Sequence, residues 1–148
     1  MNWKLAAALP LVLAGAAIAG PEENAATSRA FFRHFGAGDM AAWLATMAPD
    51  IRTWEPVGTP PNVGHEGVLA WAGQMGQMGI ASAEIDVRAV HPAGDSTAVE
   101  WTTTFTFQDG RSLEISGVDI HRFDEDGLIA EVRGYYDPSP LMAAKGEN

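Results

Sequence analysis

Hydrophobic residues recur at every second position through most of the second half of the chain, and this pattern limits the fold more than any other feature. The alternation covers residues 85–89, 99–107, 113–123 and 128–136. A period of two is typical of β-strands that bury one face. Turn-forming residues separate the runs at 92–95, 109–110 and 125–127. Short turns join antiparallel neighbours, so the pattern predicts a four-stranded antiparallel meander.

The first half of the chain has helical spacing instead. A helix is predicted from Pro21 to Phe35, ended by the glycines at 36 and 38, and a short helix capped by Asp39 is predicted to carry Met40, Trp43, Leu44 and Met47. Pro49 and Asp50 are expected to end that helix. A short strand over 51–54, a loop over 55–62 and a third helix over 65–78 follow. Helices followed by strands predict an α+β fold, a cone-shaped barrel of three N-terminal helices packed on a curved, mainly antiparallel sheet, with a cavity between the layers.

The N-terminus has the pattern of a secretory signal peptide. Lys4 precedes an apolar run that ends in Ala17-Ile18-Ala19, a small-residue cleavage pattern. We therefore expect residues 1–19 to be removed, residues 20–148 to form a single domain, and the mature protein to be periplasmic or secreted. An uncleaved N-terminal anchor is the alternative.

Charge and composition exclude several classes of function. The formal net charge is −10, which argues against nucleic acid and anionic lipid as partners. The chain has no cysteine, and its four histidines form no metal-binding motif. Neither a dinucleotide-binding motif nor a phosphate-binding loop is present, so we expect neither a metal nor a cofactor.

Three polar residues stand out against this background. Asp119 falls on the strand face that otherwise carries Leu113, Ile115 and Phe123, and His121 follows on the same face. Burial favours the neutral form of a carboxyl group, which then donates a hydrogen bond. Asp119 could instead pair with a backbone amide, an arginine or His121, or the face with Val118 and Ile120 could be the buried one. Glu55 lies in a loop rich in proline and glycine, where a reactive group or a merely solvated side chain is expected.

Two segments give the chain a resemblance to a known family. Residues 54–64 (WEPVGTPPNVG) and 117–129 (GVDIHRFDEDGLI) resemble the Δ5-3-ketosteroid isomerases and the wider SnoaL-like, nuclear-transport-factor-2-like superfamily. The resemblance implies that Glu55 is the general base, where the isomerases have aspartate, and that Asp119 is the oxyanion donor. The family's second donor, a tyrosine, falls at Phe31, and Tyr136 or His121 could replace it. Other tyrosines of the family pocket fall at Met47 and Ala72.

The resemblance predicts a cofactor-independent isomerase-like enzyme that moves a proton next to a carbonyl group of a small hydrophobic substrate, steroid-like or polyketide-like. The catalytic candidates are Glu55, Asp119 and His121. The candidate substrate contacts are Phe31, Trp54, Trp71, Trp101, Phe105, Val132 and Tyr136. Two alternatives remain open: a SnoaL-type cyclase, dehydratase or hydrolase that uses Asp119 and His121, and a non-catalytic binder of hydrophobic molecules. The resemblance also implies a homodimer through the outer sheet face.

Overall fold

The computed structural model describes residues 19–146, so the predicted signal peptide lies outside the described residues except for Ala19. The chain forms α1 (Pro21–Gly36), α2 (Met40–Leu44), β1 (Met47–Trp54), β2 (Asn62–Val63), α3 (Gly64–Gly76), β3 (Ile80–Ala93), β4 (Ser96–Phe107), β5 (Ser112–Phe123), β6 (Ile129–Tyr135) and α4 (Ser139–Gly146).

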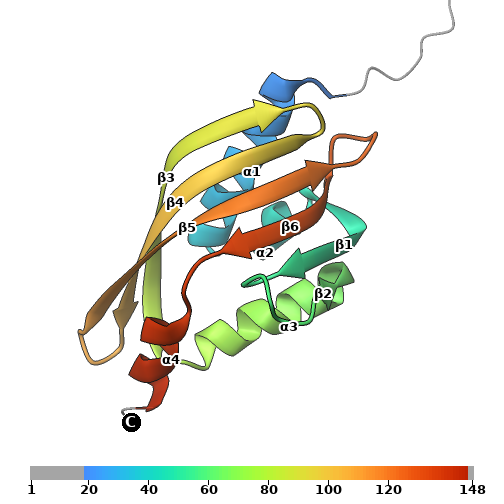
Figure 1. Ribbon diagram of the computed structural model, residues 1–148. Helices are drawn as coiled ribbons and strands as arrows, with labels where there is room; N and C mark the ends of the chain where they lie inside the picture. Colours follow the sequence, from blue (N-terminus) through green and yellow to red (C-terminus); the bar gives the residue numbers. More distant parts are fainter. Residues whose placement is uncertain (1–18, 147–148) are drawn as a thin grey trace, which may run out of the picture.

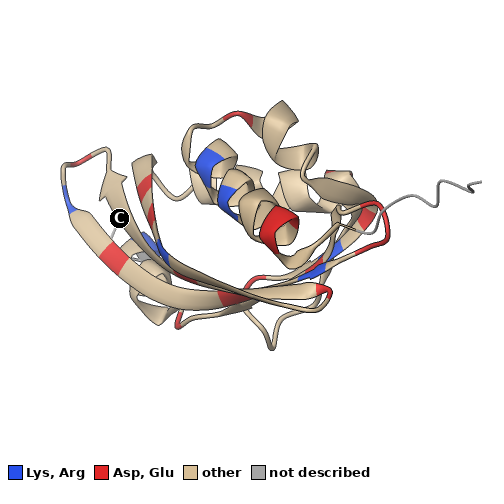
Figure 2. Ribbon diagram, turned by 90° about the horizontal axis from the view of Figure 1, so that it is seen from above, with Lys and Arg blue, Asp and Glu red and all other residues tan. Residues whose placement is uncertain are grey.

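The strands form one six-stranded sheet in the order β2-β1-β6-β5-β4-β3. All neighbouring strands are antiparallel except β1 and β6, which run parallel. The sheet is strongly curved, and α1 lies across its concave side (Figures 1 and 2). This arrangement confirms the predicted α+β class and the curved, mainly antiparallel sheet, which is open and not closed into a full barrel.

Local sequence explains where the first helices begin and end. Pro21 occupies the first turn of α1 together with Glu22 and Glu23, whose charges suit a helix N-terminus. The chain leaves α1 through Gly38, at φ +70°. Asp39 then caps α2, because its Oδ1 accepts a hydrogen bond from the Ala42 backbone N–H at 3.0 Å.

The prediction that Met47 belongs to the short helix is wrong. Met47 starts β1, which continues through Pro49 and Asp50 and pairs with β6 from Met47 opposite Ile129 to Trp54 opposite Arg133. The register shifts between Met47 and Arg52, and an irregularity of this kind accommodates a proline that cannot donate to the ladder. The short strand β2 and the C-terminal helix α4 were not predicted.

The concave face of β5 is the buried one. Asp119 is 3% exposed and His121 is 0% exposed, whereas Val118 and Ile120 on the other face are only partly buried. The face assigned from the alternation is therefore confirmed, and the alternative face is excluded as the core side. The carboxyl group of Asp119 and the imidazole of His121 both lie inside the apolar layer.

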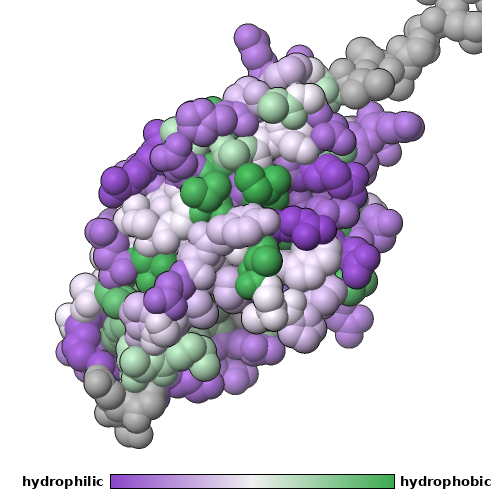
Figure 3. Space-filling model, in the orientation of Figure 1, coloured by the Kyte–Doolittle hydropathy of each residue, from purple (hydrophilic) through white to green (hydrophobic). Residues whose placement is uncertain are grey.

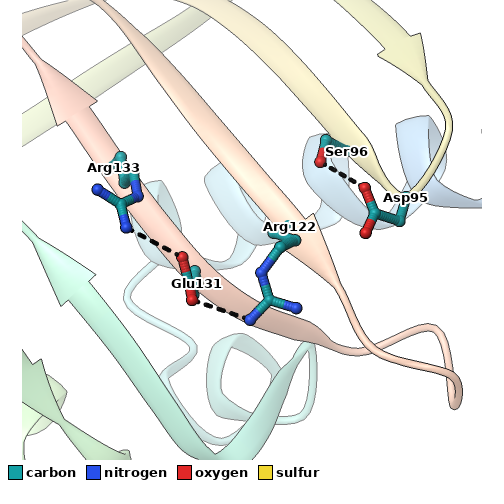
Figure 4. Close-up of polar contacts among 5 residues, drawn as sticks. All are labelled: Asp95, Ser96, Arg122, Glu131 and Arg133. Atoms are coloured by element: carbon teal, nitrogen blue, oxygen red, sulfur yellow. Dashed lines mark hydrogen bonds and ion pairs between the residues drawn. The ribbon is translucent and has the colours of Figure 1, made fainter.

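The convex face of the sheet is mainly hydrophilic, with a few hydrophobic residues between polar ones (Figure 3). Glu131 accepts hydrogen bonds from Arg122 at 2.9 Å and from Arg133 at 3.4 Å (Figure 4). The guanidinium groups of Arg52 and Arg133 lie over the ring of Trp54. Within residues 19–146, no helix is both long enough and apolar enough to cross a membrane.

Candidate functional site

An apolar cavity lies between the helices and the concave face of the sheet. Its walls come from the four helices α1 to α4, from β1 and β3 to β5, and from the residues that follow β1 and β6. The hydrophobic residues that line it, apart from Trp101, are Phe31, Phe32, Phe35, Trp43, Val68, Trp71, Met75, Ile85, Phe105, Ile115 and Leu141. A cavity with such walls suits an apolar ligand, since binding removes apolar surface from water.

The polar groups of the cavity come from neighbouring strands. Besides the indole of Trp101, they are those of Thr53, Glu55, Thr103, Asp119 and Tyr136. Glu55 follows the end of β1, and the loop after it is attached to β6 because the Val57 N–H donates to the Gly134 carbonyl at 2.8 Å. Asp119 on β5 is directly paired with Gly134 on β6. The two carboxyl groups therefore approach the cavity from either side of Gly134.

Two glycines make room for these side chains. A Cβ atom at Gly134 would overlap with Oε2 of Glu55. A Cβ atom at Gly117 would lie 2.7 Å from the Trp101 ring and 2.9 Å from Cβ of Tyr136. The bare backbone at these positions allows Glu55, Trp101 and Tyr136 to lie against the sheet.

Asp119 is held by an indole. Nε1 of Trp101 donates a hydrogen bond to Oδ1 of Asp119 at 2.7 Å. The other oxygen, Oδ2, lies 3.9 Å from Nε2 of His121. A buried carboxyl group needs such partners, because desolvation without a hydrogen bond is costly.

Burial raises the pKa of Glu55 well above its usual value near 4.5, and the negative charge of Asp119 raises it further. A hydrogen bond from Tyr136 acts in the opposite direction and favours the ionised form. The pKa of Tyr136 is also raised, first by burial and then by the charges of Glu55 and Asp119. Two carboxylates in one apolar cavity repel each other, so the cavity favours one negative charge over two.

The structure brings most of the predicted site residues to this cavity. Glu55, Asp119 and Tyr136 line it together with the predicted ligand contacts Phe31, Trp71, Trp101 and Phe105. Residues that are distant in the sequence thus meet around one space, as the proposed roles require.

Three predicted site residues lie elsewhere, and the structure corrects their placement. Trp54 points to the convex face, because successive residues of a strand alternate and Thr53 and Glu55 face the cavity. Val132 is 0% exposed within the hydrophobic core and does not line the cavity. His121 is also absent from the cavity wall, behind the rings of Phe31 and Phe32.

Sequence reasoning missed other cavity residues. The helical spacing of Phe32 and Phe35, and the position of Trp43 in the predicted short helix, could have indicated that these side chains lie near the cavity. Thr53 could have been assigned from its position two residues before Glu55, near the end of the predicted strand. No local signal predicts Leu141, since it reaches the cavity from the unpredicted helix α4.

No basic side chain lines the cavity in the part of the chain that the structure describes. Within the same residues, no group of three or more histidine, aspartate or glutamate side chains gathers in a way that could hold a metal ion. The polar groups available at this site are the two carboxyl groups, the tyrosine hydroxyl, the indole N–H and the hydroxyl groups of Thr53 and Thr103.

The family of SnoaL-like domains matches residues 28–132, which is most of the described chain. The chain belongs to the SnoaL-like domain family. The match includes the cavity from α1 to β6, with Glu55 and Asp119, and stops before Tyr136 and α4. The fold and the family together confirm the resemblance seen in the sequence.

Several solved structures have a fold similar to that of this SnoaL-like domain. A Δ5-3-ketosteroid isomerase from Mycobacterium sp. is 26% identical, with a TM-score of 0.68 over 79% of this chain and 95% of the isomerase. RV0760c from Mycobacterium tuberculosis, solved in complex with estradiol-17β-hemisuccinate, is 25% identical, with a TM-score of 0.69 over 79% of this chain and 95% of its own. An NTF2-like protein of unknown function from Burkholderia pseudomallei is 24% identical, with a TM-score of 0.74 over 82% of this chain and 96% of its own, and shows the shared fold.

Proposed function

We propose that this SnoaL-like protein catalyses cofactor-independent proton transfer next to a carbonyl group of a small, neutral, hydrophobic ligand. One observation carries the proposal: two carboxyl groups, those of Glu55 and Asp119, line a single cavity that is otherwise mostly apolar. One carboxylate can take a proton from carbon while a neutral acid group donates a hydrogen bond to the carbonyl oxygen. The family resemblance assigns the base to Glu55 and the donor to Asp119.

The environment of the carboxyl groups suits this chemistry. A carboxyl group can act as an acid or as a base when its pKa lies near the working pH, and burial moves the pKa of Glu55 in that direction. Hydrogen bonds to a developing enolate are also stronger in a cavity that excludes water. The same walls that bind an apolar ligand therefore strengthen the polar contacts.

The class of ligand follows from the lining. Without a basic side chain among the described lining residues, a ligand carboxylate or phosphate inside the cavity would face only carboxyl groups. A neutral, flat and apolar ketone suits the aromatic walls. The ketosteroid isomerase and the estradiol-17β-hemisuccinate complex among the similar structures support a steroid-like ligand.

The test is proton exchange in deuterated water. The full chain is incubated with 2-tetralone, a compact hydrophobic ketone, and deuterium uptake next to the carbonyl is followed by NMR. We expect exchange with the wild type and a loss of about 100-fold or more in the double variant Glu55→Gln/Asp119→Asn. The matched control is Glu125→Gln/Asp126→Asn on an exposed turn, which should exchange like the wild type.

Equal exchange rates in the wild type and the Glu55→Gln/Asp119→Asn variant would overturn the proposal. A wild type that binds estradiol tightly, followed by tryptophan fluorescence, but exchanges no protons of 2-tetralone or of a Δ5-3-ketosteroid would favour a non-catalytic binding protein instead.

We also propose that two copies pair through the convex sheet face, where Val118 and Ile120 are partly buried and Tyr135 is 51% exposed. Sedimentation should give twice the mass of one chain, and a monomer at micromolar concentration would contradict the pairing.

Export by the N-terminal signal is a further proposal, which cell fractionation would test.

A further inference from the structure

The two carboxyl groups of the cavity have different hydrogen-bond partners. Oδ1 of Asp119 accepts from Nε1 of Trp101 at 2.7 Å. An indole N–H can only donate, whereas the hydroxyl group of Tyr136, the partner of Glu55, can donate or accept. Each fixed donor stabilises the ionised form of a carboxyl group. Asp119 therefore has a partner that can only donate, whereas Glu55 has a partner that can also accept.

The imidazole of His121 is a second polar group close to Asp119. Nε2 of this fully buried ring has no hydrogen-bond partner among the described residues and lies 3.9 Å from Oδ2 of Asp119. Nδ1 lies 3.0 Å from Oγ of Ser28, which is 2.7 Å from Oγ1 of Thr97. If Thr97 donates to Ser28 and Ser28 donates to Nδ1, the ring hydrogen is on Nε2 and faces the carboxylate.

The other polar groups beside Gly134, those of Glu55 and Tyr136, can act as hydrogen-bond donors. Burial and the charge of Asp119 raise the pKa of both Glu55 and Tyr136. When both groups are neutral, the hydrogen bond between Glu55 and Tyr136 uses one of their two O–H groups, and the other O–H can donate to a ligand oxygen.

We propose that Asp119 is the base of this cavity and that the neutral, hydrogen-bonded pair of Glu55 and Tyr136 donates a hydrogen bond to the ligand's carbonyl oxygen, which reverses the roles implied by the family resemblance. The assignment rests on the proposed function. His121 is a positioning residue in this scheme, because it faces Asp119 and does not line the cavity.

The proton transfer balances with these groups alone. Oδ2 of Asp119 takes the proton from the carbon next to the carbonyl, and the electron pair of the broken C–H bond forms a C=C bond. The π electrons of the C=O bond move to the oxygen, whose negative charge is stabilised by the hydrogen bond from the Glu55–Tyr136 pair. Asp119 then returns the proton to the same or another carbon, and the original state is restored.

This assignment also explains Phe31. The resemblance implies that the family's tyrosine donor stands at this position, close to the aspartate that shares its role. If Asp119 is the base, no second donor is needed beside it. The ring of Phe31 then packs edge-on against His121 at 4.9 Å and shields the imidazole from the cavity.

The single variants Glu55→Gln and Asp119→Asn distinguish the two assignments. In the 2-tetralone exchange assay, Asp119→Asn should lose about 100-fold or more, because an amide cannot take the proton. Glu55→Gln should stay within about 10-fold of the wild type, because the glutamine amide still donates a hydrogen bond. A larger loss in Glu55→Gln than in Asp119→Asn would overturn the proposal.

Infrared spectroscopy of the full chain at neutral pH tests the assignment without a ligand. The C=O stretch of a protonated carboxyl group should be present in the wild type, absent in Glu55→Gln and retained in Asp119→Asn. Its loss in Asp119→Asn, or its absence from the wild type, would refute the assignment. If the two variants lose exchange equally, the presence or absence of this band in each variant decides which carboxyl group is protonated.

The role of His121 has its own test. His121→Phe keeps a ring between Phe31 and Phe32 but removes the donor, whereas His121→Gln offers an amide N–H near Asp119. We expect a lower kcat by about 10- to 100-fold in the phenylalanine variant, with little change in KM, and partial recovery in the glutamine variant. Equal kcat values in both variants would exclude the positioning role.

Outcomes for the two proposals are separable. Failure of the Glu55→Gln/Asp119→Asn double variant to reduce exchange would refute the proposed function. Loss of exchange in that variant, together with an infrared band that disappears in Asp119→Asn, would leave the function standing and refute only the reversed assignment.

Discussion

Replacing Gly134 by alanine would put a methyl group where the carboxylate of Glu55 now lies. The added Cβ atom would overlap with Oε2 of Glu55 and come within 3.1 Å of its Cδ and 3.0 Å of Cε1 of Tyr136. Ordinary contacts of a Cβ atom are 3.4 Å or longer. The carboxyl group of Glu55 therefore has to move by about 1 Å, and a displacement of this size costs on the order of 100-fold in rate.

The expected results of Gly134→Ala are a loss of about 100-fold in 2-tetralone exchange and a decrease of about 1–3 kcal/mol in the free energy of unfolding, as for other overpacked sites. Urea denaturation measures the second quantity. Combining Gly134→Ala with Glu55→Asp, whose side chain is one methylene shorter, should cost less than the two single changes together.

Gly73→Ala is the matched control. It makes the same chemical change inside α3, where no atom lies within 4 Å of the new Cβ. Exchange should be unchanged and stability should increase by about 0.5–1 kcal/mol, because alanine is the better helix former. Wild-type exchange in Gly134→Ala would refute the reasoning that Glu55 must occupy its present position.

Two further variants test the electrostatics of the cavity. Because the pKa of Glu55 is raised in the folded state, the folded protein holds the carboxyl proton more tightly than the unfolded chain, so this residue's contribution to stability is largest at low pH and declines as the pH rises above about 4.5. Denaturation at several pH values should show the wild type losing stability relative to Glu55→Gln over that range, and a difference that does not depend on pH would contradict this. Trp101→Phe removes the donor to Asp119 and should cost about 1.5–3 kcal/mol in unfolding free energy. Trp71→Phe, in the same cavity but without that hydrogen bond, is its control, and an equal cost in both variants would count against the role of the indole.

The alternation of residues predicted the long strands and favoured one face of each as the buried one, while the face with Val118 and Ile120 remained an alternative until the structure was known. Alternation is a local property, because every second side chain of a strand points to the same side. Asp119 could therefore be placed inside the apolar layer before any contact was known. The helix over Pro21–Gly36 was equally readable from its first turn and from the glycines after it.

Tertiary structure decided what the local pattern leaves open. The segment Met47–Trp54 becomes a strand because it pairs in parallel with β6, which is far along the chain, and this long-range pairing overrides a helix-like spacing. The place of Leu141 in the cavity wall and the space that Gly134 leaves for Glu55 also depend on contacts between residues that are far apart in the sequence. The partners of Asp119 also come from other elements: Trp101 from β4, and Ser28 from α1 through His121. Hydrogen bonds between distant segments orient a buried polar group, and such contacts exist only once the chain has folded.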